Sequence, residues 1–159
     1  MPAPFHILLR NHQAGGQAAV NLFRRAARAQ RGRPYATQLR QLATEAREDL
    51  DFNESVMRRL GVRPSPVQVL ALRAGGRIGR LKPNGQLLRR APLSDLIELE
   101  GLIASVSIKL AGWQAAQVSG VLNEEETRQL DQLMVRARSQ ADRLSDLHQQ
   151  AAATVLTDR

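Results

Sequence analysis

The sequence predicts an all-α protein in which four helices form one bundle. Three observations support this prediction. Four long segments carry apolar residues at helical spacing, short turns join the first pair and the second pair, and a long connection separates the two pairs. With 159 residues, the chain is long enough to bury a core without metals or disulfides. We therefore treat residues 1–159 as a single domain.

The first helix is expected to span residues 4–31. At 100° per residue, the residues that fall on one face are Phe5, Leu8, His12, Gly15, Ala19, Phe23, Ala26 and Gln30. The opposite face carries Gln17, Arg24, Arg28 and Arg31. The pattern indicates an amphipathic helix whose arginines point away from the core.

The second helix is expected to span residues 35–60. Gly32 and Pro34 end the first helix and start this one, and Gly61 ends it. Its inward stripe is predicted to be Tyr35, Leu39, Leu42, Ala46, Asp49, Asn53, Val56 and Leu60. Because so few residues separate the two helices, they must form an antiparallel hairpin.

Residues 61–94 show no long helical period and are expected to connect the two halves of the bundle. A capping box at Ser65 predicts a short helix within the connection, and the sequence from Lys82 to Gly85 predicts a β-turn. The glycines of AGGRIG lack the Gly-Lys-Ser/Thr and the preceding strand of a phosphate loop. The basic residues that the connection places on the outside of the bundle are Arg77, Arg80, Lys82, Arg89 and Arg90.

The third and fourth helices are expected at residues 95–117 and 124–155. The third has an apolar seam at heptad spacing, which runs from Leu96 to Trp113. Asn123 followed by Glu126 forms a capping box for the fourth helix. Gly120 lies between the two helices, so they are also expected to form a hairpin.

Two hairpins joined by one long crossover make the second and third helices run in the same direction. In helix lengths and in the position of the crossover, the chain resembles the ferritin-like superfamily over nearly its whole length. The resemblance implies a four-helix bundle that can hold a pair of iron or manganese ions between its helices.

The ligands that this resemblance implies are mostly missing. The first helix has no Asp or Glu, and no helix carries Glu-x-x-His. The alternative interpretation is a divergent di-iron or di-manganese oxidase or hydroxylase, with Glu45, Asp49, Glu100 and His148 as ligands. The favoured interpretation has no metal, no cofactor and no catalytic residue.

Three polar residues are predicted to be buried in the bundle. His12 is expected to hydrogen-bond Asn53 or Asp49, because buried polar groups need partners. His148 is expected to pair with Glu100 in the same way. No serine, histidine and acid share a face and a height, so a hydrolase triad is not predicted.

The positive charge is unevenly distributed along the sequence. The net charge is +8, and residues 1–44 and 61–94 each hold seven basic residues and no acid. This asymmetry favours an anionic partner such as nucleic acid, although 21 arginines among 23 basic residues also fit a compositional bias.

The sequence also limits how such a partner would be bound. With five aromatic residues, there is no stacking platform for bases, so binding would use backbone phosphates. The arginines could instead contact residues 124–126 of a second copy, and the expected assembly is a homo-oligomer, in the simplest form a homodimer.

Other sequence features bear on location. The absence of cysteine excludes disulfides and thiol chemistry. The apolar run PFHILL is interrupted by Arg10, so neither a secretory signal nor a membrane span is predicted. The sequence therefore predicts a cytoplasmic protein.

Overall fold

The computed structural model describes residues 3–33, 35–65 and 92–157, and these residues form four helices. They are α1 (Pro4–Ala29), α2 (Ala36–Arg59), α4 (Pro92–Gln117) and α5 (Glu124–Thr157). Within these residues there is no strand, which confirms the all-α prediction. The helix predicted at 95–117 begins three residues earlier, at Pro92. The short helix and β-turn predicted within the crossover fall in 66–91, outside the described residues.

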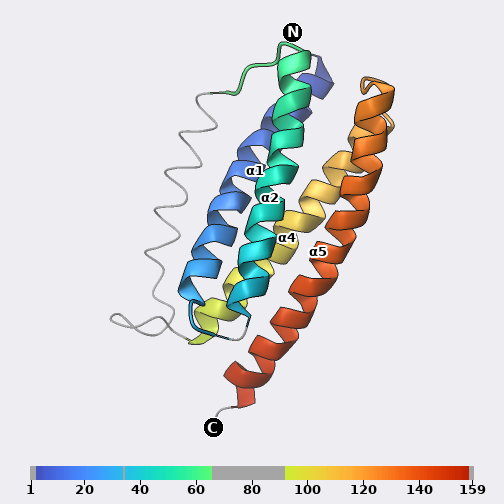
Figure 1. The fold of residues 1–159 in the computed structure, drawn as a ribbon. Helices are drawn as coiled ribbons and strands as arrows, with labels where there is room; N and C mark the ends of the chain where they lie inside the picture. The colour runs from blue at the N-terminus through green and yellow to red at the C-terminus, as the bar shows by residue number, and fades with distance from the viewer. Residues whose placement is uncertain (1–2, 34, 66–91, 158–159) are drawn as a thin grey trace.

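The four helices form two antiparallel hairpins that lie side by side (Figure 1). Helix α1 packs against α2 and α4 against α5, and α1 also packs against α4. Close backbone approaches between α2 and α5 are few. In Figure 1, α2 and α4 run in the same direction, so α4 begins at the opposite end of the bundle from the end of α2.

The helix ends follow from local sequence. Gly61 has φ +66, and the Val62 N–H donates to the Met57 carbonyl at 2.9 Å, which closes a Schellman motif at the end of α2. At the start of α5, the Glu126 N–H donates to Asn123 Oδ1 at 2.8 Å and the Asn123 N–H donates to Glu126 Oε2 at 3.0 Å. The predicted capping box is therefore confirmed.

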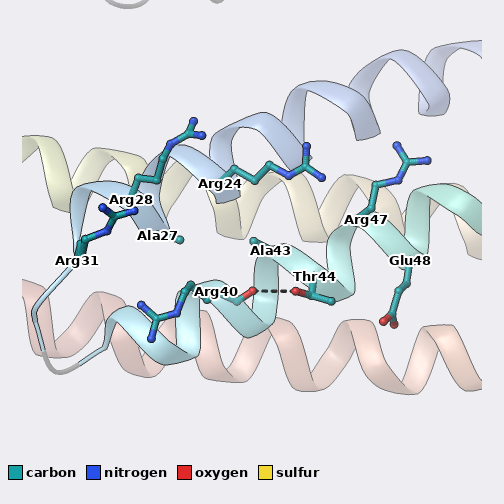
Figure 2. A pocket seen from close by; sticks show the side chains of 9 residues that line it. All are labelled: Arg24, Ala27, Arg28, Arg31, Arg40, Ala43, Thr44, Arg47 and Glu48. Carbon is teal, nitrogen blue, oxygen red and sulfur yellow. Dashed lines mark hydrogen bonds between the residues drawn. The ribbon is translucent and has the colours of Figure 1, made fainter.

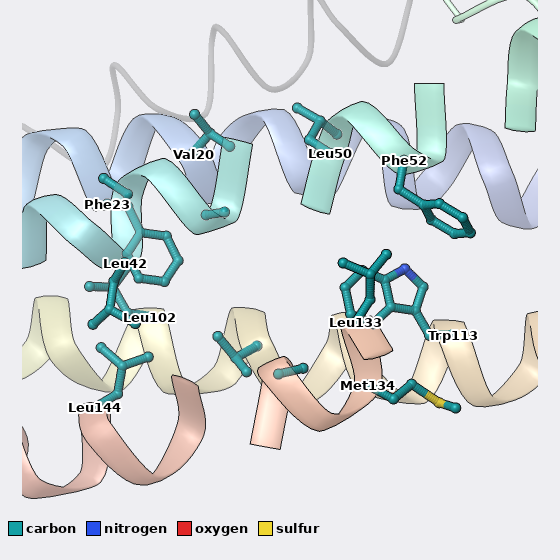
Figure 3. Packing of buried hydrophobic residues seen from close by; sticks show 14 of the residues in the cluster. Val20, Phe23, Leu42, Leu50, Phe52, Leu102, Trp113, Leu133, Met134 and Leu144 are labelled. Atoms are coloured by element: carbon teal, nitrogen blue, oxygen red, sulfur yellow. The ribbon is translucent and has the colours of Figure 1, made fainter. Parts of the chain in front are cut away.

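The core receives side chains from all four helices (Figure 3). Phe23, Leu42, Leu102 and Leu144 come from α1, α2, α4 and α5 in turn, and each is fully buried. In α2 six residues of the predicted stripe are buried, Asp49 and Asn53 among them, whereas Tyr35 and Leu60 at its two ends are half-buried. Because the core is shared by both hairpins, it sets the position of the polar side chains on each helix relative to the others.

The predicted inner face of α1 is only partly correct. Phe23 and Ala26 are buried, but Gly15 is exposed and His12 is half-buried. The side chains that enter the core near these positions are Leu9 and Val20. The apolar period therefore predicted the core-facing side of α1 about one residue away from its true position. Gly15 and Ala19 have little apolar area, so they define this side only weakly.

Candidate anion-binding groove and buried ionic network

A groove lined by five arginines runs between α1 and α2. The short turn at Gly32 keeps the two helices adjacent, and between them lies a cavity of about 450 Å³. Its floor is formed by small side chains, Ala27, Ala43 and Thr44. Arginines from both helices surround this floor, as Figure 2 shows: Arg24, Arg28, Arg31, Arg40 and Arg47.

The α1 side of the groove follows the helical period. Arg24, Arg28 and Arg31 are spaced i, i+4 and i+7, so they lie along one face and extend over about 10 Å at 1.5 Å per residue. All three are exposed. The prediction that they face away from the core is therefore confirmed.

The positive charges of the groove are only partly neutralised. Among the described residues, Arg24, Arg28 and Arg31 make no ion pair and no side-chain hydrogen bond. Arg47 does bind acids, Asp51 and Glu54. The groove therefore has a surplus of cationic groups, and bound anions would relieve their mutual repulsion.

Glu48 is the one acid that lines the groove within the described residues. Its carboxylate turns away toward α5, as Figure 2 shows, and accepts a hydrogen bond of 2.7 Å from Arg136 Nη1. It therefore adds no negative charge close to the three unpaired arginines. Within the described part of the chain, the Arg40 guanidinium donates to the Thr37 hydroxyl at 2.8 Å and binds no acid.

The basic residues predicted on the crossover cannot be placed beside this groove. Arg77, Arg80, Lys82, Arg89 and Arg90 lie outside the described residues. Their predicted contribution to a basic surface stays a prediction.

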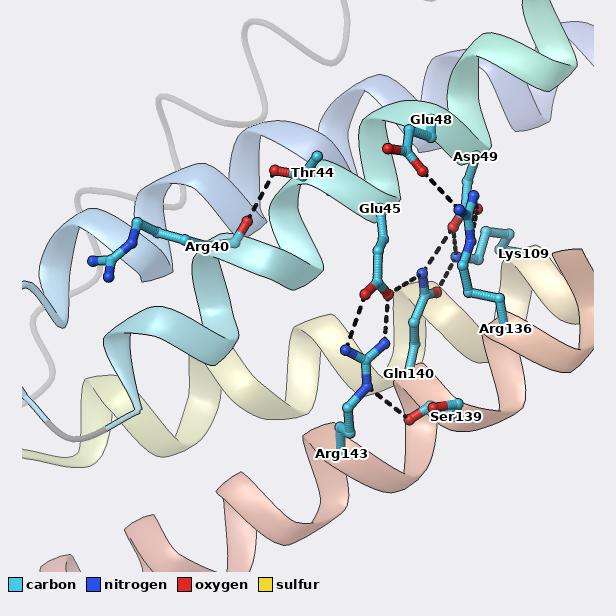
Figure 4. Close-up of polar contacts among 10 residues, drawn as sticks. All are labelled: Arg40, Thr44, Glu45, Glu48, Asp49, Lys109, Arg136, Ser139, Gln140 and Arg143. Atoms are coloured by element: carbon cyan, nitrogen blue, oxygen red, sulfur yellow. Dashed lines mark hydrogen bonds and ion pairs between the residues drawn. The ribbon is translucent and has the colours of Figure 1, made fainter.

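A second polar cluster, here named the ionic network, joins α2 to α4 and α5 inside the bundle (Figure 4). At its centre the Asp49 carboxylate, with 2% of its side chain exposed, binds Lys109 of α4 and Arg136 of α5. Gln140 Nε2 donates to Asp49 Oδ2 and to Glu45 Oε2, each at 3.1 Å. One buried carboxylate is thus held by side chains from two other helices.

The outer part of the ionic network completes its charge balance. Arg143 Nη1 donates to Glu45 Oε1 at 3.0 Å, and its second Nη also binds Glu45. With Glu48 included, three acids face three bases: Glu45, Glu48 and Asp49 against Lys109, Arg136 and Arg143. The network is therefore neutral and leaves no excess charge for a ligand.

Burial and pairing shift the pKa values of several network groups, among them Lys109 and Glu45. Burial lowers the pKa of the Lys109 ammonium, and the charge of Asp49 offsets this only in part. For Glu45, burial acts to raise the pKa, but hydrogen bonds from Arg143 and Gln140 outweigh it and the pKa lies below its usual value. Glu45 is thus held ionised by its partners.

The four residues of the dimetal alternative do not form one site. Glu45 and Asp49 belong to the ionic network, where guanidinium and ammonium groups occupy their oxygens. Glu100 instead faces His148, at 3.3 Å, which confirms that predicted pair. Among the described residues, no group of three or more His, Asp or Glu side chains is arranged to hold a metal ion. The residues present do not fit an iron or manganese pair.

The expected partner of His12 is wrong. Asn53 donates to the Leu9 carbonyl at 3.3 Å and to Gln13 Oε1 at 2.9 Å, while Asp49 is occupied by the ionic network. In the described part of the chain, the His12 ring makes no hydrogen bond. It lies against Gly112 of α4, since a Cβ added there would be 2.1 Å from His12 Cε1.

Several residues of these sites were not identified from the sequence. Arg40 and Arg47 were overlooked because their place in the groove depends on how α2 sits against α1. Lys109 could have been found, because it is the only charged residue between Gly101 and Leu122. An isolated lysine in an otherwise uncharged helix indicates a buried partner.

Comparisons with protein-family models, with curated proteins and with solved structures each gave no match. Searched over its described residues, the chain has no helix that is both long and apolar enough to cross a membrane. The interpretation of function therefore depends on the groove and the network themselves.

Proposed function

We propose that this four-helix chain, resembling the ferritin-like type in its connectivity, is a non-catalytic binding module for a phosphate-bearing polyanion. Its partner would be nucleic acid, held through the backbone in the groove between α1 and α2. The observation that carries the proposal is the row of Arg24, Arg28 and Arg31, which have no acidic partner among the described residues. A homodimer remains a further expectation from the sequence.

The chemistry of the groove favours phosphate. A guanidinium offers paired N–H donors that match two phosphate oxygens, and Arg40 of α2 adds such donors to the α1 row. No aromatic residue of the described ranges lines the groove, so these residues offer no stacking surface for bases. Binding would follow the backbone and show little sequence preference.

Two alternatives receive less support. Of the acids 124–126 offered to a second copy, Glu126 is buried and bound to Arg59 at 2.6 Å, and Glu125 is bound to Arg128 at 2.6 Å. A dimetal oxidase would need the carboxylates that the ionic network uses. In the groove, by contrast, Arg24, Arg28 and Arg31 are not engaged by any acid of the described residues.

The test is a fluorescence anisotropy titration of a labelled DNA duplex at several salt concentrations. If three phosphates are neutralised, the slope of log K against log salt is about −2.7, a loss of about 40-fold in affinity between about 50 and 200 mM salt. The variant R24Q/R28Q/R31Q should remove most of this salt dependence. Its free energy of unfolding should change by less than about 0.5 kcal/mol, since the three side chains are exposed and unpaired.

A matched control separates the groove from net charge. R58Q/R63Q/R138Q removes the same three charges from exposed positions that do not line the groove. We expect it to bind DNA nearly as the parent chain does. Equal weakening by both triple variants, absence of salt-sensitive binding, or tighter binding of polyglutamate than of DNA would each contradict the proposal.

A further inference from the structure

A second cavity, here named the His12 cavity, lies between α1, α2 and α4 and shares no lining residue with the arginine groove. Its volume is about 250 Å³. Most of its wall is apolar, formed in part by Phe23, Leu50 and Trp113, which are labelled in Figure 3. An apolar cavity of about 150 Å³ is enough to bind benzene, so this one has room for a substituted ring.

The cavity exists because α1 has small residues where it faces α4. Gly15, Gly16 and Ala19 line it, and larger side chains there would fill it. A Cβ on Gly16 would lie 2.7 Å from Leu50 Cδ1, whereas a Cβ on Gly15 would meet nothing within 4 Å. The open space therefore begins at Gly15.

One polar group of the wall lacks a partner. His12 makes no hydrogen bond within the described residues, and burial lowers its pKa. Its ring is therefore neutral near pH 7 and offers one N–H donor and one acceptor nitrogen. Groups that orient a ligand in an apolar pocket are few and of this kind.

The charged residues of the wall are already satisfied. Asp49 and Lys109 bind each other, and the Lys109 ammonium lies 5.1 Å from the centre of the Trp113 ring. The cavity therefore has no net charge to attract an ion. It matches an uncharged molecule better than an acid or a base.

We propose that the His12 cavity binds a small uncharged aromatic molecule that carries one hydroxyl or N–H group. The ring occupies the apolar part of the cavity, and the polar group hydrogen-bonds the His12 imidazole. This proposal is independent of the anion-binding function, because the two cavities have no residue in common.

The test uses phenol and toluene, which have similar shape and differ in the hydroxyl group. Trp113 is the only tryptophan of the chain and lines the cavity, so its fluorescence reports on occupancy. Calorimetry gives the affinity independently. We expect saturable binding of both, with phenol tighter by about 2- to 10-fold, the size of one net hydrogen bond.

Two variants locate the binding. G15L should abolish binding of both probes, because Gly15 lines the cavity and is exposed, so a leucine there would cover the opening of the cavity. Replacing a helical glycine should also raise the unfolding midpoint, which shows that the variant is folded. H12L should keep toluene binding and remove the preference for phenol.

The control is N21L, which adds the same side chain to α1 at an exposed position outside both cavities. It should leave both affinities unchanged. The proposal is overturned if neither probe saturates, if G15L binds phenol as the parent chain does, or if phenol keeps its advantage over toluene in H12L.

Discussion

Replacing Asp49 with asparagine should strongly destabilise the fold. The carboxylate is buried and binds both Lys109 and Arg136, so D49N removes the negative charge while both cations stay in place. Breaking a buried ion pair from one side costs about 3–5 kcal/mol. Lys109 and Arg136 keep 20% and 28% of their side chains exposed, so water screens them in part and we expect the lower value, about 3 kcal/mol.

Urea unfolding followed by circular dichroism at pH 7 measures this loss. For a chain of this size, about 3 kcal/mol also corresponds to a midpoint lower by about 6 to 12 °C in thermal unfolding. The matched control is D51N, two residues along the same helix. Asp51 is 54% exposed and pairs with Arg47 at the surface, so D51N should cost at most about 1 kcal/mol.

A double-mutant cycle tests whether the cost of D49N arises from unpaired charge. In D49N/K109M one of the two uncompensated cations is also removed. The double variant should therefore be more stable than the sum of the single losses predicts, by about 0.5 to 3 kcal/mol. Our account of the ionic network is refuted if D49N and D51N are equally stable, or if the effects of D49N and K109M simply add.

Two further predictions concern pH and helix packing. Burial acts to raise the pKa of Glu126. Hydrogen bonds from Arg59 and from the Asn123 backbone N–H outweigh the effect of burial, so the pKa of Glu126 is lowered from its usual value. The ionised Glu126 carboxylate stabilises the fold above its unfolded-state pKa, and this contribution is lost as pH falls through the lower pKa of the folded state. In urea unfolding below about pH 5, the free energy of unfolding of E126Q should therefore decrease less with falling pH than that of the parent chain. G112A should lower the free energy of unfolding by about 1–3 kcal/mol in the same assay, because the added Cβ would overlap the His12 ring. G101A should lower it less, because a Cβ on Gly101 would lie 3.3 Å from Leu22 Cδ2.

The helices themselves could be predicted from the sequence because their cause is local. Apolar spacing, Gly61 and the Asn123 capping box are each visible within a few residues, and the structure places helix ends close to them. The outward position of Arg24, Arg28 and Arg31 follows from the same period. Periodicity was weaker in α1 near Gly15, where small side chains leave the direction of the face undetermined.

The ionic network could not be predicted, because it depends on how far α5 is displaced along its axis against α2. Glu45 and Asp49 are of the residue type that binds metal ions, but the bases that bind them lie on α4 and α5, far away in the sequence. Arg136 and Arg143 reach these acids only at one axial position of α5. Nothing local in either helix specifies that position.

This dependence on axial position also explains what the ionic network contributes. Helices α2 and α5 approach each other closely at few backbone positions, so long polar side chains connect them where apolar packing is sparse. A neutral buried network adds little net stability compared with apolar packing of the same volume. A shift of α5 by one turn, about 5.4 Å, would separate Arg136 and Arg143 from Asp49 and Glu45 and leave buried charges unpaired. The network therefore selects one arrangement of the two hairpins, and it does so without Arg24, Arg28 and Arg31, which make no ion pair among the described residues.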